Sequence, residues 1–270
     1  IEALTKAVDQ NKVQLNFSDG VQDIQQVENG YELTTKSGKY FFETVIITTG
    51  STPKFWKSLK DLGLKIVSPV PSLFTFNCKD PRIEGLMGIS FENAAIKINQ
   101  HKLEAEGPML ITHWGFSGPA VLRLSAWGAL RLNECGYKFE IEINFVSQSK
   151  EDIIALLNNK KQQDAKKNIH KYNPFDFPKR FWLSILQYCQ IGEQKVYADL
   201  SKKQIEAVAI ELTQGNYSVH GKSTFKDEFV TAGGVDLKEI DFQSMQAKKL
   251  PHLFFAGEVL NIDAITGGFN

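Results

Sequence analysis

Two short apolar runs that each end in glycine constrain the fold of this 270-residue chain more than any other feature. The first is V-I-I-T-T-G at residues 45–50, and the second is L-F-F-A-G at residues 253–257. Apolar side chains on both faces of such a run are typical of a strand buried on both sides in an α/β layer. The likeness of the two runs predicts two strands of one sheet, with a long stretch of chain inserted between them.

The residues before the first run predict further elements of this layer. Apolar side chains recur at helical spacing over residues 1–8, and residues 13–17 alternate as a strand does. Turn signals at Asn29-Gly30 and Ser37-Gly38 then separate short apolar runs. The pattern predicts a small antiparallel meander over residues 21–42.

The inserted segment, residues 69–230, is expected to form a different domain. Its start is marked by prolines at positions 69, 71 and 81. Strands are expected at residues 73–77, 96–99 and 139–145, and helices are expected at residues 117–132, 149–157 and from 201 onward. The last of these helices begins with Ser201-x-x-Gln204, which resembles a capping box.

Composition excludes several classes of protein. The chain has 31 Lys and Arg against 31 Asp and Glu, so no global field would gather nucleic acid or an anionic membrane. The basic stretch at residues 160–171 predicts a solvated helical face or loop. No apolar run reaches about 18 residues, so no membrane span is expected. We expect a small-molecule substrate, no nucleic-acid or membrane partner, and no particular oligomeric state.

Cysteine usage indicates a reducing compartment. Cys78, Cys135 and Cys189 lie far apart and form no C-x-x-C pair. This spacing argues against a disulfide framework and against a zinc site. We expect a cytoplasmic protein without a metal.

The end of the chain carries the most informative motif, A-G-E-V-L-N-I-D-A-I-T-G-G-F-N at residues 256–270. A predicted strand ends in Gly257 and the carboxylate of Glu258, and Gly267-Gly268 stand where a helix would begin. Glycines let backbone N–H groups approach a ligand, and a helix N-terminus favours negative charge. A carboxylate at a strand end accepts hydrogen bonds from sugar-like hydroxyls. The alternative is an ordinary turn with a solvated Glu258, and the residue types alone do not favour either interpretation.

This ending resembles the pattern A-G-E-x-L-D-x-D-x-x-T-G-G-Y-N of the YhiN-like or BaiN-like flavoproteins. Three other stretches resemble the same family in the same order: I-T-T-G at residues 47–50, T-H-W-G-F-S-G-P at 112–119, and T-A-G-G-V at 231–235. Asn261 stands where the family usually has Asp, Phe269 replaces the usual Tyr, and Ser51 replaces a common second glycine. Four motifs over nearly the whole chain identify it as a member of this family.

The family's first dinucleotide-binding loop, G-x-G-x-x-G, has no counterpart in this sequence. In the family that loop precedes the present region and holds the FAD pyrophosphate. The chain also begins at Ile1 rather than at a methionine. The resemblance therefore implies a C-terminal piece of a longer bacterial flavoprotein, and we expect the piece alone to bind FAD weakly and to be inactive.

The resemblance implies a fold and an activity. The fold would be mixed α and β, with residues 1–68 and 231–270 as part of a three-layer FAD/NAD(P)-binding domain. Residues 69–230 would be an inserted domain with a β-barrel-like portion and a helical portion. The parent protein would be an FAD-dependent oxidoreductase acting on a small organic substrate, with NAD(P)H as a candidate reductant. No residue defines the substrate.

The family pattern also assigns the cofactor-binding residues. Thr49 and Gly50 would lie on the adenosine or pyrophosphate side of FAD, and Gly257 and Glu258 would meet its ribityl and phosphate groups. The ribityl chain and the pyrimidine edge of the isoalloxazine would be met by residues of the final loop: Asp263, Thr266, Gly267, Gly268, Phe269 and Asn270. Gly233 and Gly234 would line the flavin cleft from a re-entry loop.

His113 and Thr112 are the candidate catalytic residues. A histidine before a G-x-S-G-P turn can reach flavin or substrate as a proton donor or orienter. A histidine bonded to the loop backbone is the alternative, and the residues leave both open. Ser117 is expected to be a plain helix N-cap, with Pro119 in the first turn.

Two functions of other classes stay open from the sequence. In one, the inserted domain is a protein-binding module and the flavin site is vestigial. In the other, the parent protein is a flavin-dependent tRNA-modifying enzyme, which the neutral charge and the lack of a basic stripe with interleaved aromatics disfavour.

Overall fold

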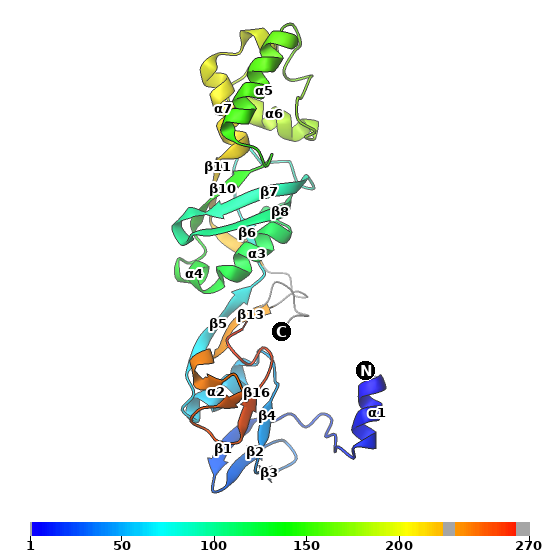
Figure 1. The fold of residues 1–270 in the computed structure, drawn as a ribbon, viewed down its shortest axis with the longest axis vertical. Coiled ribbons are helices and arrows are strands. Elements are labelled where there is room, and N and C mark those ends of the chain that lie inside the picture. The colour runs from blue at the N-terminus through cyan, green and yellow to red at the C-terminus, as the bar shows by residue number, and fades with distance from the viewer. Residues whose placement is uncertain (1, 224–229, 263–270) are drawn as a thin grey trace. The chain divides into compact units, whose positions relative to one another are not determined.

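Two units, each built around a core of its own, make up the chain (Figure 1). The first unit contains the chain up to Pro69 and Gly233–Ile262, and the second contains Val70–Ala232. The computed structural model describes residues 2–223 and 230–262.

The predicted meander is present in the first unit. Strands β1 (Asp23–Val27), β2 (Gly30–Thr34) and β3 (Lys39–Phe42) pair antiparallel in that order. The turn between β1 and β2 requires glycine, because a Cβ on Gly30 would lie 2.4 Å from the carbonyl oxygen of Phe42. The N-G signal therefore predicted both the turn and its position.

The start of the chain is only partly as expected. Helix α1 (Glu2–Gln10) confirms the helical spacing, but the strand predicted at residues 13–17 is wrong. Phe17 is 81% exposed, and none of the described strands pairs with this segment. Alternating residues form a strand only where a neighbouring strand accepts their backbone hydrogen bonds.

The two apolar runs lie side by side in one sheet, as predicted. Strand β4 (Val45–Ile47) pairs parallel with β16 (Leu253–Phe255), and Ile47 stands opposite Phe255. The short strands β15 (Gln246–Ala247) and β14 (Ile240–Asp241) extend this sheet beyond β16.

One face of β4 is covered and the other is exposed. Helix α2 (Pro53–Asp61) shares a core with Val45 and Ile47, and the indole nitrogen of Trp56 donates to the carbonyl oxygen of Val259 at 3.0 Å. Ile46, on the opposite face, is 68% exposed. The prediction of a strand buried on both faces is wrong for the described residues, because α2 packs on one face only.

Strands β5 (Ile66–Ser72) and β13 (Val230–Val235) form a separate two-stranded sheet. Beyond them, seven strands of the second unit form one antiparallel sheet in the order β11-β10-β7-β8-β9-β6-β12. Their bounds are β6 (Thr75–Asn77), β7 (Ser90–Ile98), β8 (Leu103–Ile111), β9 (Gly115–Ser117), β10 (Phe139–Asn144), β11 (Gly215–Val219) and β12 (Gly221–Ser223).

This sheet closes on itself as a barrel. Strands β11 and β12 are one nearly continuous run of chain, which pairs with β10 through its first half and with β6 through its second. The backbone N–H of His220, between them, donates to the carbonyl oxygen of Asn77 at 2.9 Å. Inward-facing apolar residues alternate along the strands, as Phe139, Ile141 and Ile143 do in β10.

Two groups of helices pack on the barrel. Helices α3 (Pro119–Trp127) and α4 (Ala129–Glu134) follow β9. The other group, which we call the helical cap, contains α5 (Lys150–Gln163), α6 (Lys179–Tyr188) and α7 (Lys202–Thr213) (Figure 1). One apolar core runs through barrel and cap without interruption.

Helix starts were predicted well where a side chain caps them. Ser149 and Ser201 each form a capping box, which confirms both predicted starts. Ser117 is not an N-cap: Gly118, with a φ of 100°, is the cap residue of α3. A Cβ on Gly118 would lie 2.9 Å from the carbonyl oxygen of Pro108, so the close approach of β8 decides this helix start.

The described structure is mixed α and β and includes a barrel with a helical portion, as the resemblance implied. Among the residues described, no helix has the length and apolar character needed to cross a membrane.

Candidate functional site

The carboxyl ends of β4 and β16 bring four predicted cofactor-binding residues to one edge of the sheet. Thr49 and Gly50 follow β4, and Gly257 and Glu258 follow β16. The ends of the two strands are held side by side, because the backbone N–H of Ala256 donates to the carbonyl oxygen of Ile47 at 3.0 Å. Ligands of open α/β sheets bind outside such strand ends.

Gly50 and Gly257 leave open space over the backbone at these two strand ends, and we call this pair the glycine cradle. Their φ angles are 63° and 78°, and a Cβ built on either would meet no atom within 4 Å. A positive φ favours glycine, and the open space allows a ligand to approach the backbone closely. From Gly50 the chain leads directly into the N-terminus of α2, where partial positive charge favours an anion.

Strand β13 holds the loop that carries Glu258. The backbone N–H of Val235 donates to the carbonyl oxygen of Val259, and the N–H of Asn261 donates to the carbonyl oxygen of Val235. Glu258 is half-buried in this loop and has an interaction partner. The loop is therefore ordered by the sheet and does not depend on a ligand for its backbone hydrogen bonds.

The segment around Gly233 and Gly234 is a strand, so the expected re-entry loop is wrong. A Cβ on Gly233 would lie 2.7 Å from Cα of Pro69, and one on Gly234 would lie 2.6 Å from the carbonyl oxygen of Val259. These glycines are needed because neighbouring backbone crosses them closely. Their contact with a flavin stays a prediction.

Six of the predicted cofactor-binding residues lie outside the described residues. They are Asp263, Thr266, Gly267, Gly268, Phe269 and Asn270.

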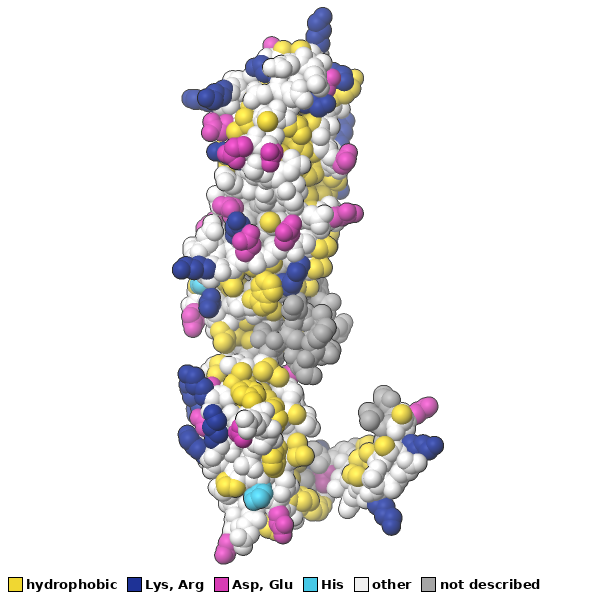
Figure 2. All heavy atoms as spheres, in the orientation of Figure 1, with side chains coloured by type: hydrophobic (Ala, Val, Ile, Leu, Met, Phe, Trp, Pro, Cys, Tyr) yellow, Lys and Arg dark blue, Asp and Glu magenta, His cyan; other side chains and the backbone are white. Residues whose placement is uncertain are grey.

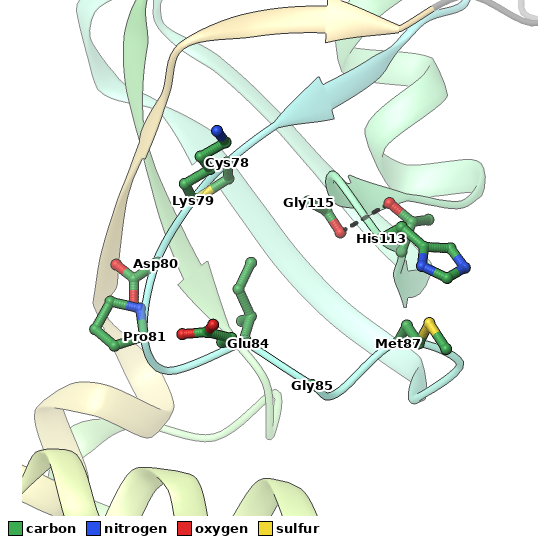
Figure 3. A pocket seen from close by; sticks show the side chains of 11 residues that line it. Cys78, Lys79, Asp80, Pro81, Glu84, Gly85, Met87, His113 and Gly115 are labelled. Carbon is green, nitrogen blue, oxygen red and sulfur yellow. Dashed lines mark hydrogen bonds between the residues drawn. The ribbon is translucent and has the colours of Figure 1, made fainter.

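The second unit contains a pocket of about 600 Å³ that includes both predicted catalytic residues (Figure 3). His113 and Thr112 line it from the turn between β8 and β9, and the chain after β6 supplies most of the remaining wall. That wall includes Cys78, Asp80 and Glu84. Figure 3 shows His113 and Met87 at the opposite side of the view from Asp80 and Pro81.

Thr112 and His113 differ in what they are free to do. The hydroxyl of Thr112 donates to the carbonyl oxygen of Gly115 at 3.1 Å, and its backbone N–H donates to the same oxygen at 2.7 Å. His113 is exposed at the pocket, with its ring centroid 6.0 Å from that of Trp114. The geometry makes Thr112 a residue that shapes the turn and leaves the imidazole of His113 accessible to a ligand.

Sequence reasoning missed the other ionisable groups of this pocket, because none belongs to a motif. Cys78 is buried, and burial raises the pKa of its thiol to about 12, with the charge of Asp80 adding to the effect. Lys79 and Glu84 are exposed at the pocket. The thiol is therefore protonated at neutral pH, and Lys79 and Glu84 are the accessible groups among these.

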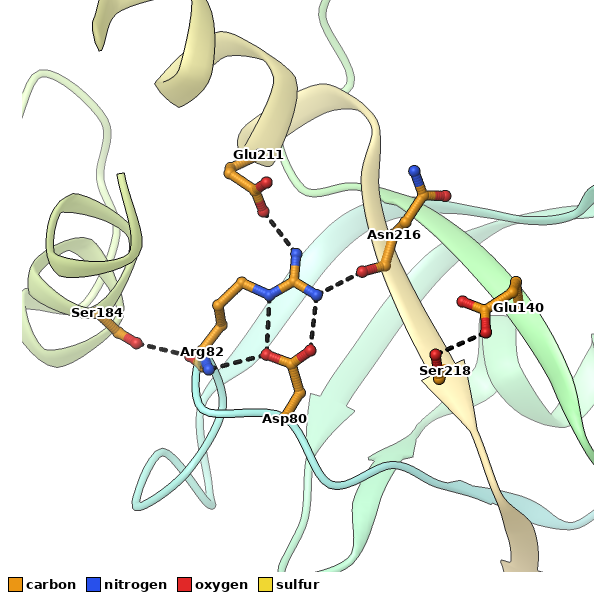
Figure 4. Close-up of polar contacts among 7 residues, drawn as sticks. All are labelled: Asp80, Arg82, Glu140, Ser184, Glu211, Asn216 and Ser218. Carbon is orange, nitrogen blue, oxygen red and sulfur yellow. Dashed lines mark hydrogen bonds and ion pairs between the residues drawn. The ribbon is translucent and has the colours of Figure 1, made fainter. Parts of the chain in front are cut away.

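A buried ion cluster holds the pocket wall in place (Figure 4). The guanidinium of Arg82 donates to Asp80, to Glu211 of α7 at 2.6 Å and to the carbonyl oxygen of Asn216. The hydroxyl of Ser184, on α6, donates to the carbonyl oxygen of Arg82 at 2.8 Å. Barrel, α6 and α7 are therefore joined through Arg82, which lies between the wall residues Pro81 and Ile83.

Aromatic rings complete this cluster. The guanidinium carbon of Arg82 lies 3.8 Å from the ring centroid of Tyr217 and 4.6 Å from that of Tyr188. Burial lowers the pKa of Arg82, but the hydrogen bonds and charges of its carboxylate partners outweigh burial and raise it overall. Arg82 is therefore a permanent positive charge and is fully engaged in structure.

The model of the family described as HI0933-like protein barrel and H2TH domain matches residues 70–230 of the chain. This range covers the barrel and the helical cap.

Curated relatives match the whole chain. A ribosomal RNA dihydrouridine synthase of Escherichia coli (strain K12) is 24% identical over 282 residues, and the alignment covers 100% of this chain and 67% of the relative. A protein of the same name from Haemophilus influenzae is also 24% identical, with 68% of its length covered. A 3-dehydro-bile acid delta(4,6)-reductase of Clostridium scindens is 22% identical, again with 68% covered. The chain thus spans about two thirds of the length of these relatives.

Proposed function

The chain belongs to the HI0933-like protein family, and we propose that it is the substrate-side and flavin-closing part of an FAD-dependent reductase. Its substrate would contain a carbon–carbon double bond conjugated to a carbonyl group. The observation that carries the proposal is the glycine cradle at the parallel strand ends of β4 and β16, in a chain whose second unit holds a separate pocket with an accessible histidine.

The names of the relatives point to one chemistry. Dihydrouridine is uridine whose C5–C6 double bond, conjugated to the C4 carbonyl, has been reduced. A 3-dehydro-bile acid delta(4,6)-reductase acts on ring double bonds in line with a carbonyl at position 3. In each reduction the carbon farther from the carbonyl takes a hydride and the nearer carbon takes a proton. An enzyme of this class needs a hydride source and a proton donor.

The described residues fit FAD at the strand ends. Gly50 and Gly257 leave space over the backbone, and α2 directs its N-terminus to the same edge. We assign Thr49 and Gly50 to the adenosine or pyrophosphate side, and Glu258 to a hydroxyl-bearing part of the cofactor. When bound, FAD supplies the hydride, and NAD(P)H is the proposed source of its electrons.

His113 is the proposed proton donor. It is accessible in a pocket large enough for a pyrimidine or one ring of a steroid, and an imidazole within reach of a substrate can donate a proton to it. The hydrogen bonds of Thr112 to Gly115 hold the turn that presents His113, so Thr112 is a positioning residue. We infer that the carbonyl-bearing end of the substrate enters this pocket.

The proposal is tested on the protein extended to the length of its relatives. It should purify yellow, its flavin should be bleached by NAD(P)H without oxygen, and the colour should return when a conjugated acceptor is added. Two acceptors separate the substrate classes: a uridine-containing fragment of ribosomal RNA and a 3-oxo-Δ4 steroid. Mass spectrometry should find two added hydrogen atoms in one of them. A colourless protein would instead favour a binding module with a vestigial flavin site.

A further inference from the structure

Charge is unevenly distributed along this neutral chain. Residues 160–203 contain ten Lys and Arg against four Asp and Glu, a net charge of +6. The remainder of the chain therefore carries −6. This segment lies wholly in the helical cap. The zero net charge of the whole chain therefore conceals a basic region.

The fold gathers the lysines of this segment at one end of the cap. Residues 165–169 and 195–198 run side by side, with the backbone N–H of Ile169 donating to Lys195 and that of Tyr197 donating to Lys167. The ammonium group of Lys161, on α5, donates to the carbonyl oxygen of Leu200, just before α7 begins. The C-terminal end of α5 and the N-terminal end of α7 thus meet. We call this surface the lysine end: Lys161, Lys166, Lys167, Lys195, Lys202 and Lys203.

Carboxylates neutralise only part of the lysine end. Asp164 accepts from Lys160 at 2.9 Å and from Lys167 at 2.8 Å, so one carboxylate is shared by two ammonium groups. Lys161 and Lys202 line a shallow groove together with Glu206. Asp199 and Glu193 are exposed on the same connection. Lysines still outnumber carboxylates on these elements, and Figure 2 shows Lys and Arg side chains projecting from this end of the second unit.

An exposed aromatic ring lies within this basic surface. Tyr172 is 53% exposed, and the ammonium group of Lys167 lies 5.3 Å from its ring centroid. Its backbone is fixed, because the hydroxyl of the buried Tyr197 donates to the carbonyl oxygen of Tyr172 at 2.6 Å. An exposed aromatic ring beside cations is the combination with which proteins stack a nucleobase and hold the adjoining phosphates.

We propose that the lysine end and Tyr172 form an RNA-binding surface, with the lysines on phosphates and the tyrosine ring on an unpaired base. The inference rests on the proposed function and narrows its substrate to a uridine within RNA. Lysine side chains alone would bind any polyanion. The ring adds the preference for an accessible base.

The test measures binding of a labelled ribosomal RNA hairpin with a single-stranded loop, by fluorescence anisotropy at several salt concentrations. The chain should bind the hairpin, and its affinity should fall steeply with salt. Replacing Lys161, Lys202 and Lys203 by Gln should weaken binding about 10- to 100-fold and reduce the salt slope by about 2, since each lost phosphate contact removes about 0.7. Tyr172→Ala should weaken binding about 10-fold, while Tyr172→Phe keeps the ring and should not.

A matched control triple replaces Lys54, Lys57 and Lys60, which are exposed on α2 in the first unit, by Gln. It changes net charge equally and should leave RNA affinity nearly unchanged. Equal losses in both triples, or no binding by the original chain at low salt, overturns the proposal. Anionic vesicles that bind as tightly as RNA and depend on the same lysines also overturn it.

The outcome is separable from that of the proposed function. A yellow protein that reduces the steroid acceptor but binds no RNA retains the proposed function and loses the RNA surface. Tight, lysine-dependent RNA binding by a protein that holds no flavin supports the RNA-binding surface and contradicts the proposed function.

Discussion

Arg82 binds Asp80 through two parallel hydrogen bonds, from Nε to Oδ1 at 2.8 Å and from Nη2 to Oδ2 at 2.7 Å. Both side chains are largely removed from solvent, at 5% and 16% exposure. A paired guanidinium and carboxylate of this kind fixes orientation as well as charge. Asp80 lines the pocket, and Arg82 connects it to Asn216 of the barrel and to Glu211 of the helical cap.

Arg82→Met is expected to destabilise the second unit by about 3–5 kcal/mol, because it leaves the carboxylates of Asp80 and Glu211 buried without their cation. Urea denaturation followed by circular dichroism measures the loss. Lys97→Met removes an exposed ion pair with Glu104 and should have little effect. Similar midpoints for the two variants would show that the cluster contributes no more than a surface pair.

Stability of the second unit should fall at acidic pH in a way that depends on Asp80. Burial raises the pKa of this carboxyl, but the hydrogen bonds from Arg82 and its charge lower the pKa by more than burial raises it. The pKa therefore lies below its ordinary value of 3.8. The unfolded chain therefore takes up this proton first as pH falls, and the contribution is lost from about pH 4 downward. Urea midpoints from pH 7 to 3 should fall more steeply for the original protein than for Asp80→Asn. Parallel curves would contradict the assignment.

Cys78 should resist alkylation in the folded protein. With a pKa of about 12, its thiol contains very little thiolate at pH 8, and the side chain is buried. Iodoacetamide followed by peptide mass spectrometry should label it slowly in buffer and rapidly in urea. Rapid labelling in buffer would mean that the pocket wall opens.

Glu258→Ala is expected to weaken FAD binding by about 10- to 100-fold while the melting temperature stays close to the original. The reason is the loss of charge-assisted hydrogen bonds, each contributing about 1.5–3 kcal/mol. Equilibrium flavin titration of the extended protein measures the change. Glu43→Ala, an exposed carboxylate of the same unit, is the control. Equal affinities for all three proteins would remove Glu258 from the cofactor site.

His113→Ala should slow reduction of the conjugated acceptor by about 10²- to 10⁴-fold, the usual contribution of a general acid. Reduction of the flavin by NAD(P)H needs no such donor and should be unchanged. Rapid-mixing kinetics separate the two half-reactions, with His101→Ala as the control. An unchanged acceptor half-reaction with a lowered melting temperature would make His113 a structural residue.

Local signals were enough to predict several elements. The N-G turn, the helix starts at Ser149 and Ser201, and the placing of the two glycine-ended strands in one sheet depend on residues close in sequence or on repeated patterns. Interactions between distant residues were beyond such reasoning. Arg82 is separated from Glu211 by 129 positions and from Asn216 by 134, and no motif marks any of the three.

Gly233 and Gly234 show the same limit at the candidate site. Two adjacent glycines permit either approach of a ligand or approach of backbone. Only the three-dimensional structure shows that Pro69 and Val259 lie against them. The basic segment was expected to be a solvated face or loop. A neutral total charge gave no reason to look further, and the position of Tyr172 beside Lys167 depends on the fold.

The closure of the barrel by β11 and β12 imposes an order on folding. Asn77 of β6 pairs with Gly221, so one edge of the barrel has no partner until nearly the whole second unit has been synthesised. Pairings of such large sequence separation form slowly, and an unpaired edge strand invites association with other chains. The helical cap, whose contacts are more local, is therefore expected to form first. Pairing of β11 and β12 with the rest of the barrel is expected to be the last step.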